Sequence, residues 1–143
     1  MINYESILNK NLINVLKDIL NNIYKNGLKN NNHLYITFLT NHKKVEIPTW
    51  LKKKFPNEIT IVIQYEYSDL LVYDDYFLIT LSFDDIKTKL KVDFESIISF
   101  ADPSANFGLK LKEISPKEKN NSIRKNKPSY KNNIIDFANY KKD

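Results

Sequence analysis

The apolar residues of this chain follow two different periods, and the change from one to the other near residue 30 limits the folds that the chain can adopt. Between residues 4 and 25 they recur at helical spacing and form one stripe, which is typical of an amphipathic helix. Between residues 33 and 111 they fall in short alternating or β-branched runs separated by polar turns. The patterns predict one helix followed by about six antiparallel strands, a mainly β (α+β) fold built as a small bent sheet or a partly closed barrel.

Both ends of the predicted helix carry suitable residues. Asn3 can cap its first turn, Lys25 suits the negative end of the helix dipole, and Gly27 stands where a C-terminal glycine belongs. The simplest interpretation of the stripe is core packing, but a stripe of this length can exceed the area that one small sheet covers. The candidate contacts of a homodimer are Leu8, Leu12, Val15, Leu16 and Ile19.

The strand region is divided by recognisable turn residues. The Asp74-Asp75 and Asp84-Asp85 pairs suit hairpin turns, and short helical turns are expected at 50–55 and 94–100. Strands are predicted at 33–40, 59–67, 70–73, 76–83, 87–93 and 106–111, with a short extended piece at 45–48.

The net charge of +5 comes from the C-terminal tail. Residues 1–111 hold 13 lysines against 13 acidic residues, so the predicted body is neutral and a nucleic-acid partner is not expected. Residues 113–131 are almost all polar or charged and are predicted to be disordered. Apolar residues return at 134–140, which indicates either a tail that adds a strand to its own sheet or a short linear motif for another protein.

No constellation of catalytic or metal-binding residues emerges, so we predict a protein that is not an enzyme and uses no cofactor or metal. The chain has no cysteine, two glycines, and two histidines without a ligand partner at helical spacing. The triplet Lys52-Lys53-Lys54 beside Trp50 is interpreted as a solvated loop, although basic residues next to aromatics can also bind single strands. No apolar run approaches a membrane span, and the N-terminus lacks a signal-peptide pattern, so a cytoplasmic location is expected.

The strand region resembles the SspB (stringent starvation protein B) family in its alphaproteobacterial form, from about Tyr35 to Leu111. The part around Phe100 to Leu109 is the most specific, and the tail from Ile134 to Lys142 resembles the family's docking motif. The matching segments of the body are Tyr35-Ile36-Thr37-Phe38, Val45-Glu46-Ile47-Pro48, Phe55-Pro56, Ile59-Thr60-Ile61-Val62-Ile63-Gln64, Leu78-Ile79-Thr80-Leu81-Ser82-Phe83, Phe100-Ala101-Asp102-Pro103-Ser104 and Phe107-Gly108-Leu109.

This resemblance implies an N-terminal helix and two small antiparallel sheets, Sm-like in outline, in a homodimer. It implies an adaptor that binds ssrA-tagged proteins and delivers them to the ClpXP protease, with residues 1–112 as the tag-binding domain, 113–131 as a flexible linker and 132–143 as the ClpX-docking motif. The expected peptide-binding residues are Ile36, Phe38, Val45, Ile47, Ile63, Gln64, Leu78 and Phe83, with ordinary core packing as the alternative for each apolar member. The expected ClpX-docking residues are Ile134, Ile135, Asp136, Phe137 and Tyr140. The rival interpretation of the whole chain is an Sm-like RNA-binding module, and a second rival is a structural dimer subunit.

Overall fold

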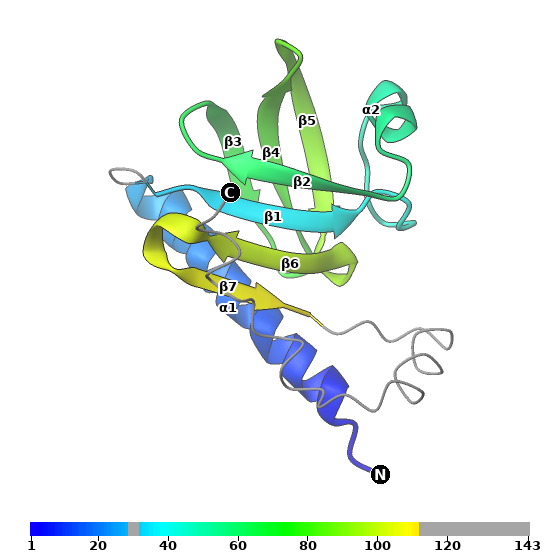
Figure 1. Ribbon diagram of the computed structural model, residues 1–143, viewed down its shortest axis with the longest axis vertical. Helices are drawn as coiled ribbons and strands as arrows, with labels where there is room; N and C mark the ends of the chain where they lie inside the picture. The colour runs from blue at the N-terminus through cyan, green and yellow to red at the C-terminus, as the bar shows by residue number, and fades with distance from the viewer. Residues whose placement is uncertain (29–31, 112–143) are drawn as a thin grey trace.

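The computed structural model describes residues 1–28 and 32–111, and it shows one long helix packed against two antiparallel sheets (Figure 1). The fold class implied by the resemblance is therefore confirmed. The linker at 113–131 and the docking motif at 132–143 lie outside the described residues, and so does the predicted disorder of the tail.

The N-terminal helix α1 spans Tyr4–Asn26 and has the ends that the sequence predicts. The Asn3 side chain accepts a hydrogen bond from the backbone N–H of Ser6 at 3.0 Å, which caps the first turn. At the other end Gly27 adopts a φ of 72°, a conformation that favours glycine, and its N–H donates to the carbonyl of Ile23. None of the described helices is both long enough and apolar enough to cross a membrane.

Seven strands of the described chain form two sheets. The strands are β1 (Leu34–Leu39), β2 (Glu58–Ile63), β3 (Tyr67–Val72), β4 (Tyr76–Phe83), β5 (Ile86–Asp93), β6 (Ile97–Asp102) and β7 (Phe107–Lys110). One sheet has the order β2-β1-β6-β7 and the other has the order β3-β4-β5. A short helix, α2 (Thr49–Lys54), lies between β1 and β2, and single 3-10 turns occupy Phe94–Ser96 and Pro103–Ala105.

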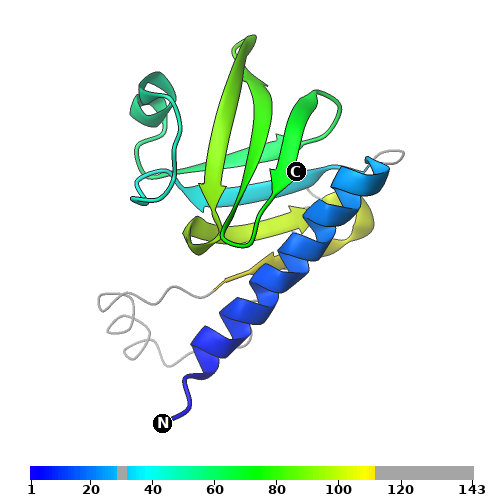
Figure 2. The same ribbon diagram turned by 180° about the vertical axis from the view of Figure 1, so that it is seen from behind.

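The core lies between the facing sides of the two sheets and the inner stripe of α1. Strand β1 contributes Leu34, Ile36 and Phe38, which alternate with half-buried residues as a strand with one core face should. From α1 the buried side chains are Leu12, Leu16, Leu20 and Ile23. Figures 1 and 2 show α1 running diagonally past β6 and β7 toward the start of β1, so one sheet does not cover the whole helix.

Two predicted elements were wrong in extent. The strand predicted at 59–67 ends at Ile63, because the chain turns at 64–66 and enters the other sheet at Tyr67. The helix predicted at 94–100 is only one 3-10 turn, Phe94–Ser96, followed by strand β6. The β-branched residues that open β6 pair with β1 there, and this ladder is favoured over a helix of the same sequence.

Candidate functional site

A hollow of about 390 Å³ lies between strand β2 and the C-terminal end of β4. The hollow lies between the two sheets, because β2 is an edge strand of one sheet and β4 is the central strand of the other. Its lining residues are Thr60, Ile61, Val62, Gln64, Tyr65, Glu66, Leu81, Ser82 and Phe83.

The hollow exists because β4 and β5 extend past the edge of the first sheet. In Figure 1 their upper ends stand above β2, and the hairpin that joins them is the highest part of the molecule. Beyond the core, the inner side of this hairpin exposes apolar surface: Phe83 is half-buried and Ile86 is 51% exposed. Apolar residues of this size next to a free strand edge provide a surface that an extended peptide can use.

Strand β2 has a free edge facing this surface. Among the described strands it pairs only with β1, from Leu34 opposite Ile63 to Leu39 opposite Glu58. The other side of β2 therefore offers unpaired backbone donors and acceptors over six residues, a length of about 20 Å at 3.3 Å per residue.

The structure separates the eight expected peptide-binding residues into three groups. Gln64 and Phe83 line the hollow. Ile36, Phe38 and Ile63 are each 0% exposed, so they form the core behind it, as the alternative of core packing anticipated.

The remaining three lie elsewhere on the body. Val45 and Ile47 are half-buried on either side of Glu46, which forms a β-bridge with Lys91 at the outer edge of β5. Leu78 pairs with Leu71 and Lys91 across the second sheet and faces away from the core. None of these three lines the hollow.

Sequence reasoning missed several residues of the hollow, among them Thr60, Tyr65 and Glu66. Thr60 and Val62 alternate with the buried Ile59, Ile61 and Ile63, and they are more exposed because they lie on the other face of β2. The Tyr65-Glu66 pair lies in the turn that the predicted strand 59–67 had absorbed. The sequence Gln64-Tyr65-Glu66 contains none of the residues typical of turns, so the turn and its part in the hollow could not be predicted.

The five expected dimer residues also fall into two groups. Leu12 and Leu16 are 8% and 0% exposed and pack into the chain's own core. Leu8 and Val15 are 38% and 37% exposed, and Ile19 is half-buried. Beside the same half of α1 lies a larger hollow of about 1230 Å³, reaching from Lys10 and Ile13 to Tyr76 and Ile98.

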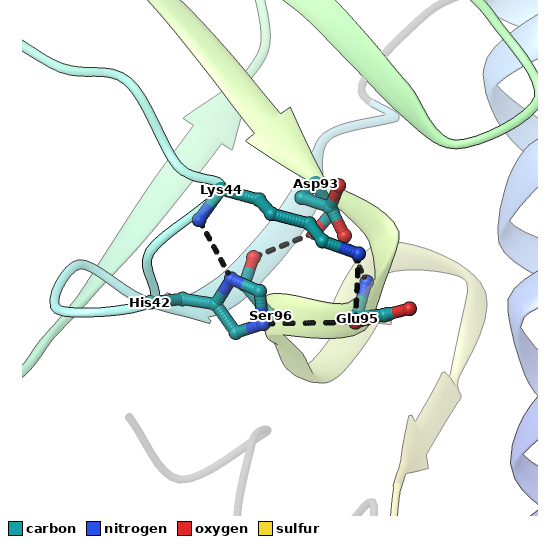
Figure 3. A network of polar contacts seen from close by, with 5 residues as sticks. All are labelled: His42, Lys44, Asp93, Glu95 and Ser96. Carbon is teal, nitrogen blue, oxygen red and sulfur yellow. Dashed lines mark hydrogen bonds and ion pairs between the residues drawn. The ribbon is translucent and has the colours of Figure 1, made fainter.

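One polar network brings a histidine and two carboxylates together (Figure 3). Candidate ligand atoms of His42, Asp93 and Glu95 lie within 4.8 Å of one another. The backbone N–H of Lys44 donates to Nδ1 of His42 at 3.1 Å, so in the neutral ring the proton is on Nε2, the atom nearest Glu95. The Lys44 ammonium forms an ion pair of 3.4 Å with the exposed Glu95 carboxylate.

The rest of this network holds the backbone between β5 and β6. Asp93, 5% exposed, accepts from the N–H of Glu95 at 2.9 Å, and the buried Ser96 hydroxyl donates to the Asp93 carbonyl at 2.6 Å. These bonds cap the 3-10 turn at Phe94–Ser96 and satisfy buried polar groups. We therefore assign the network to the fold, because the hydrogen bonds of Asp93 and Ser96 hold the backbone of this turn.

The comparisons with known proteins bear on nearly the whole chain. A family profile described as SspB, stringent starvation protein B, matches residues 6–142. No curated protein matches the chain.

Proposed function

Because this chain belongs to the SspB family, whose members are adaptors in proteolysis, we propose that it binds ssrA-tagged proteins and delivers them to the ClpXP protease. The observation that supports this proposal most directly is the hollow along the free edge of β2. A tag is a short unfolded peptide, and such a peptide can be held by a strand edge and the pockets beside it.

In this proposal the tag lies extended beside β2, and its backbone takes up the free hydrogen-bonding groups of that strand. Phe83 gives an apolar contact from the β4 side, and the Gln64 amide, which can donate and accept at once, reads a polar group of the tag. The core beneath these strands is formed in part by Ile36, Phe38 and Ile63. The bound tag makes no contact with Val45, Ile47 or Leu78.

The tail provides the second contact. We propose residues 113–131 as a linker and residues 132–143 as the motif that docks on the N-terminal domain of ClpX, through Ile134, Ile135, Asp136, Phe137 and Tyr140. A flexible linker of about 20 residues has an r.m.s. span near 25 Å. Linkers of this kind give effective concentrations on the order of millimolar, so two weak contacts act as one delivery.

The exposed side of α1 supports a homodimer. Leu8 and Val15 are partly exposed and continue the apolar row of Ile19, which is half-buried and packs against the core. A row of this kind is what a second copy of the helix would cover. Cytoplasmic location is part of the same proposal, since tags from stalled ribosomes and ClpXP meet there.

The direct test is fluorescence anisotropy with a labelled ssrA-type peptide and the purified chain. Saturable binding that an unlabelled tag peptide reverses is expected, whereas a scrambled peptide of equal composition is expected not to compete. Equal competition by the scrambled peptide would contradict tag recognition. Degradation of a tagged reporter by ClpXP, with and without the protein, then tests delivery separately from binding.

A further inference from the structure

One backbone contact shows which residues of β2 direct their hydrogen-bonding groups toward β1. The N–H of Thr40 donates to the carbonyl of Asn57 at 3.0 Å. These two residues continue the register of β1 and β2, in which Leu39 lies opposite Glu58. In an antiparallel ladder, hydrogen-bonded pairs alternate with pairs that share no backbone bond. The residues of β2 that bond to β1 are therefore every second one after Asn57: Ile59, Ile61 and Ile63.

A side-chain contact supports the same alternation. Thr37 and Thr60 lie directly opposite each other, and their hydroxyl oxygens are 2.7 Å apart. Side chains approach each other more closely in the pairs without backbone bonds. The N–H and carbonyl of Thr60 therefore point away from β1, and those of Val62, two residues further on, do the same. Thr60 and Val62 both line the hollow, so their backbone groups are directed to the free edge beside it.

The side chains of β2 alternate in the opposite sense. Ile61 is 1% exposed and belongs to the core between the two sheets, whereas Thr60 is exposed and Val62 is half-buried. Directly opposite residues of neighbouring strands project their side chains from the same face of a sheet. A peptide residue placed opposite Ile61 would thus direct its side chain toward the second sheet, where Leu81 and Phe83 line the hollow.

The character of this inner side favours an apolar side chain. Leu81 is 5% exposed, and Phe83 is half-buried and packs against the core. The only charged side chain among the lining residues is the exposed Glu66, which forms no ion pair within the described chain. A peptide carboxylate directed there would lose hydration without meeting a cation. An apolar side chain would instead bury its surface against Leu81 and Phe83.

We propose that the β2 hollow adds a bound peptide as an antiparallel strand and selects one apolar side chain, at the peptide residue opposite Ile61. The two flanking peptide residues lie opposite Thr60 and Val62 and are held by their backbones, with about two hydrogen bonds at each. Antiparallel pairing is the slightly more stable kind, and every pairing of the described strands is antiparallel. The inference rests on the proposed adaptor function and names the class of peptide that its site accepts.

This arrangement separates the roles of neighbouring peptide residues. In an antiparallel added strand, the residues opposite Thr60 and Val62 direct their N–H groups to β2, and the residue between them directs its N–H away. Loss of an N–H and replacement of a side chain should therefore affect alternate residues. In a parallel added strand the residue opposite Ile61 would use both its N–H and its side chain, so the two effects would coincide.

The test uses the full chain and two series of ssrA-type peptides, which compete with a labelled parent peptide in an anisotropy assay. The first series carries one N-methylated residue at a time, and the second replaces each residue in turn by leucine or by aspartate. N-methylation is expected to weaken binding about tenfold at two residues separated by one. The residue between them is expected to tolerate N-methylation and to favour leucine over aspartate about tenfold. Coincidence of both effects at one residue, or no alternation, would overturn the proposal.

A pair of variants tests the same bonds from the side of the protein. Thr60→Pro removes the N–H at the free edge and leaves the bonds between β1 and β2, because proline is tolerated in an edge strand where its nitrogen faces outward. Thr60→Val keeps this N–H and loses the same hydroxyl contact to Thr37, so it is the matched control. Thr60→Pro is expected to weaken the peptide about tenfold and Thr60→Val by less than about twofold. Circular dichroism checks both folds, and the peptide series decides the question even if Thr60→Pro does not fold.

The outcomes distinguish this inference from the proposed function. If the parent peptide bound no better than a scrambled one, both the adaptor proposal and the added strand would be wrong. If the parent bound specifically but with equal affinity to folded Thr60→Pro and Thr60→Val, tag recognition would stand and the added strand alone would be excluded.

Discussion

The hydroxyl of Thr40 donates a hydrogen bond to the carbonyl of Phe55 across fifteen residues of chain. Thr40 is 1% exposed and follows β1, whereas Phe55 ends α2. The backbone N–H of Thr40 also donates to Asn57 at 3.0 Å. One threonine thus fixes the end of α2 and the start of β2, the strand that lines the hollow.

Replacing Thr40 by valine is expected to lower the free energy of unfolding by about 1–3 kcal/mol, because the Phe55 carbonyl then has no donor. Chemical denaturation measures the change. The matched control is Thr37→Val, since the Thr37 and Thr60 hydroxyls, 2.7 Å apart, pair with each other on an exposed face where water can replace either partner. An equal loss of unfolding free energy in both variants would mean that the buried Thr40 hydrogen bond stabilises the fold no more than the exposed Thr37 bond does.

Asp84 and Asp85 both have positive φ angles, 51° and 64°, in the two-residue turn between β4 and β5. This is the turn type for which glycine at the second position is preferred. Asp85→Gly is therefore expected to raise the free energy of unfolding by about 1 kcal/mol. Thermal unfolding measures it. Asp85→Ala, which keeps a Cβ in the left-handed conformation, serves as the control and is expected to give no gain.

In the β2 hollow, Phe83→Ala is expected to weaken binding of an ssrA-type peptide about tenfold or more, since a half-buried aromatic next to the bound backbone acts as an anchor. Gln64→Ala removes one hydrogen-bonding side chain and is expected to cost about 2- to 10-fold. Anisotropy measures both.

The control for these two variants is Leu71→Ala. Leu71 is 40% exposed and faces away from the hollow on the other side of the second sheet, so its loss is expected to leave peptide affinity unchanged. If Leu71→Ala weakened the peptide as much as Phe83→Ala, the hollow would not be the binding site.

The two groups of α1 residues predict opposite outcomes. Leu8→Asp with Val15→Asp is expected to leave a folded chain that is monomeric by light scattering, because both side chains are partly exposed. Leu16→Ala is expected to destabilise the fold itself by about 2–5 kcal/mol, because Leu16 is fully buried. A double aspartate variant that stayed dimeric would exclude this face of α1 as the interface.

Deleting the residues after Tyr130 is expected to leave peptide affinity unchanged and to abolish stimulated degradation of a tagged reporter by ClpXP. Both quantities are measured on the same preparation. A shorter change, Ile134→Asp with Phe137→Asp, is expected to have the same effect as the deletion. Delivery of cargo by the truncated chain at the full rate would contradict tethering by the tail.

Periodicity predicted α1 almost to the residue, because the Asn3 cap, the apolar stripe and Gly27 all indicate the same boundaries. It also predicted the strand at 33–40, which the structure shows as β1 with Leu34, Ile36 and Phe38 buried on one face. It failed at 59–67, since β-branched and aromatic residues favour a strand in either sheet and do not show where the chain changes from one to the other.

The same limit explains why the site was only partly predicted. Ile36 and Phe38 have the apolar character of a pocket, but their position behind the edge strand depends on the order β2-β1-β6-β7, which no local pattern encodes. The Glu46–Lys91 bridge and the Lys54–Asp84 ion pair are likewise contacts between residues far apart in sequence, and no local pattern predicts them.

The hollow spans the seam between two sheets that share no strand. A peptide bound there contacts both sheets at once. It therefore links two sheets that are otherwise held together by side-chain packing. Occupancy should therefore restrain the β4–β5 hairpin relative to β2, and the empty adaptor is then the more deformable of its two states.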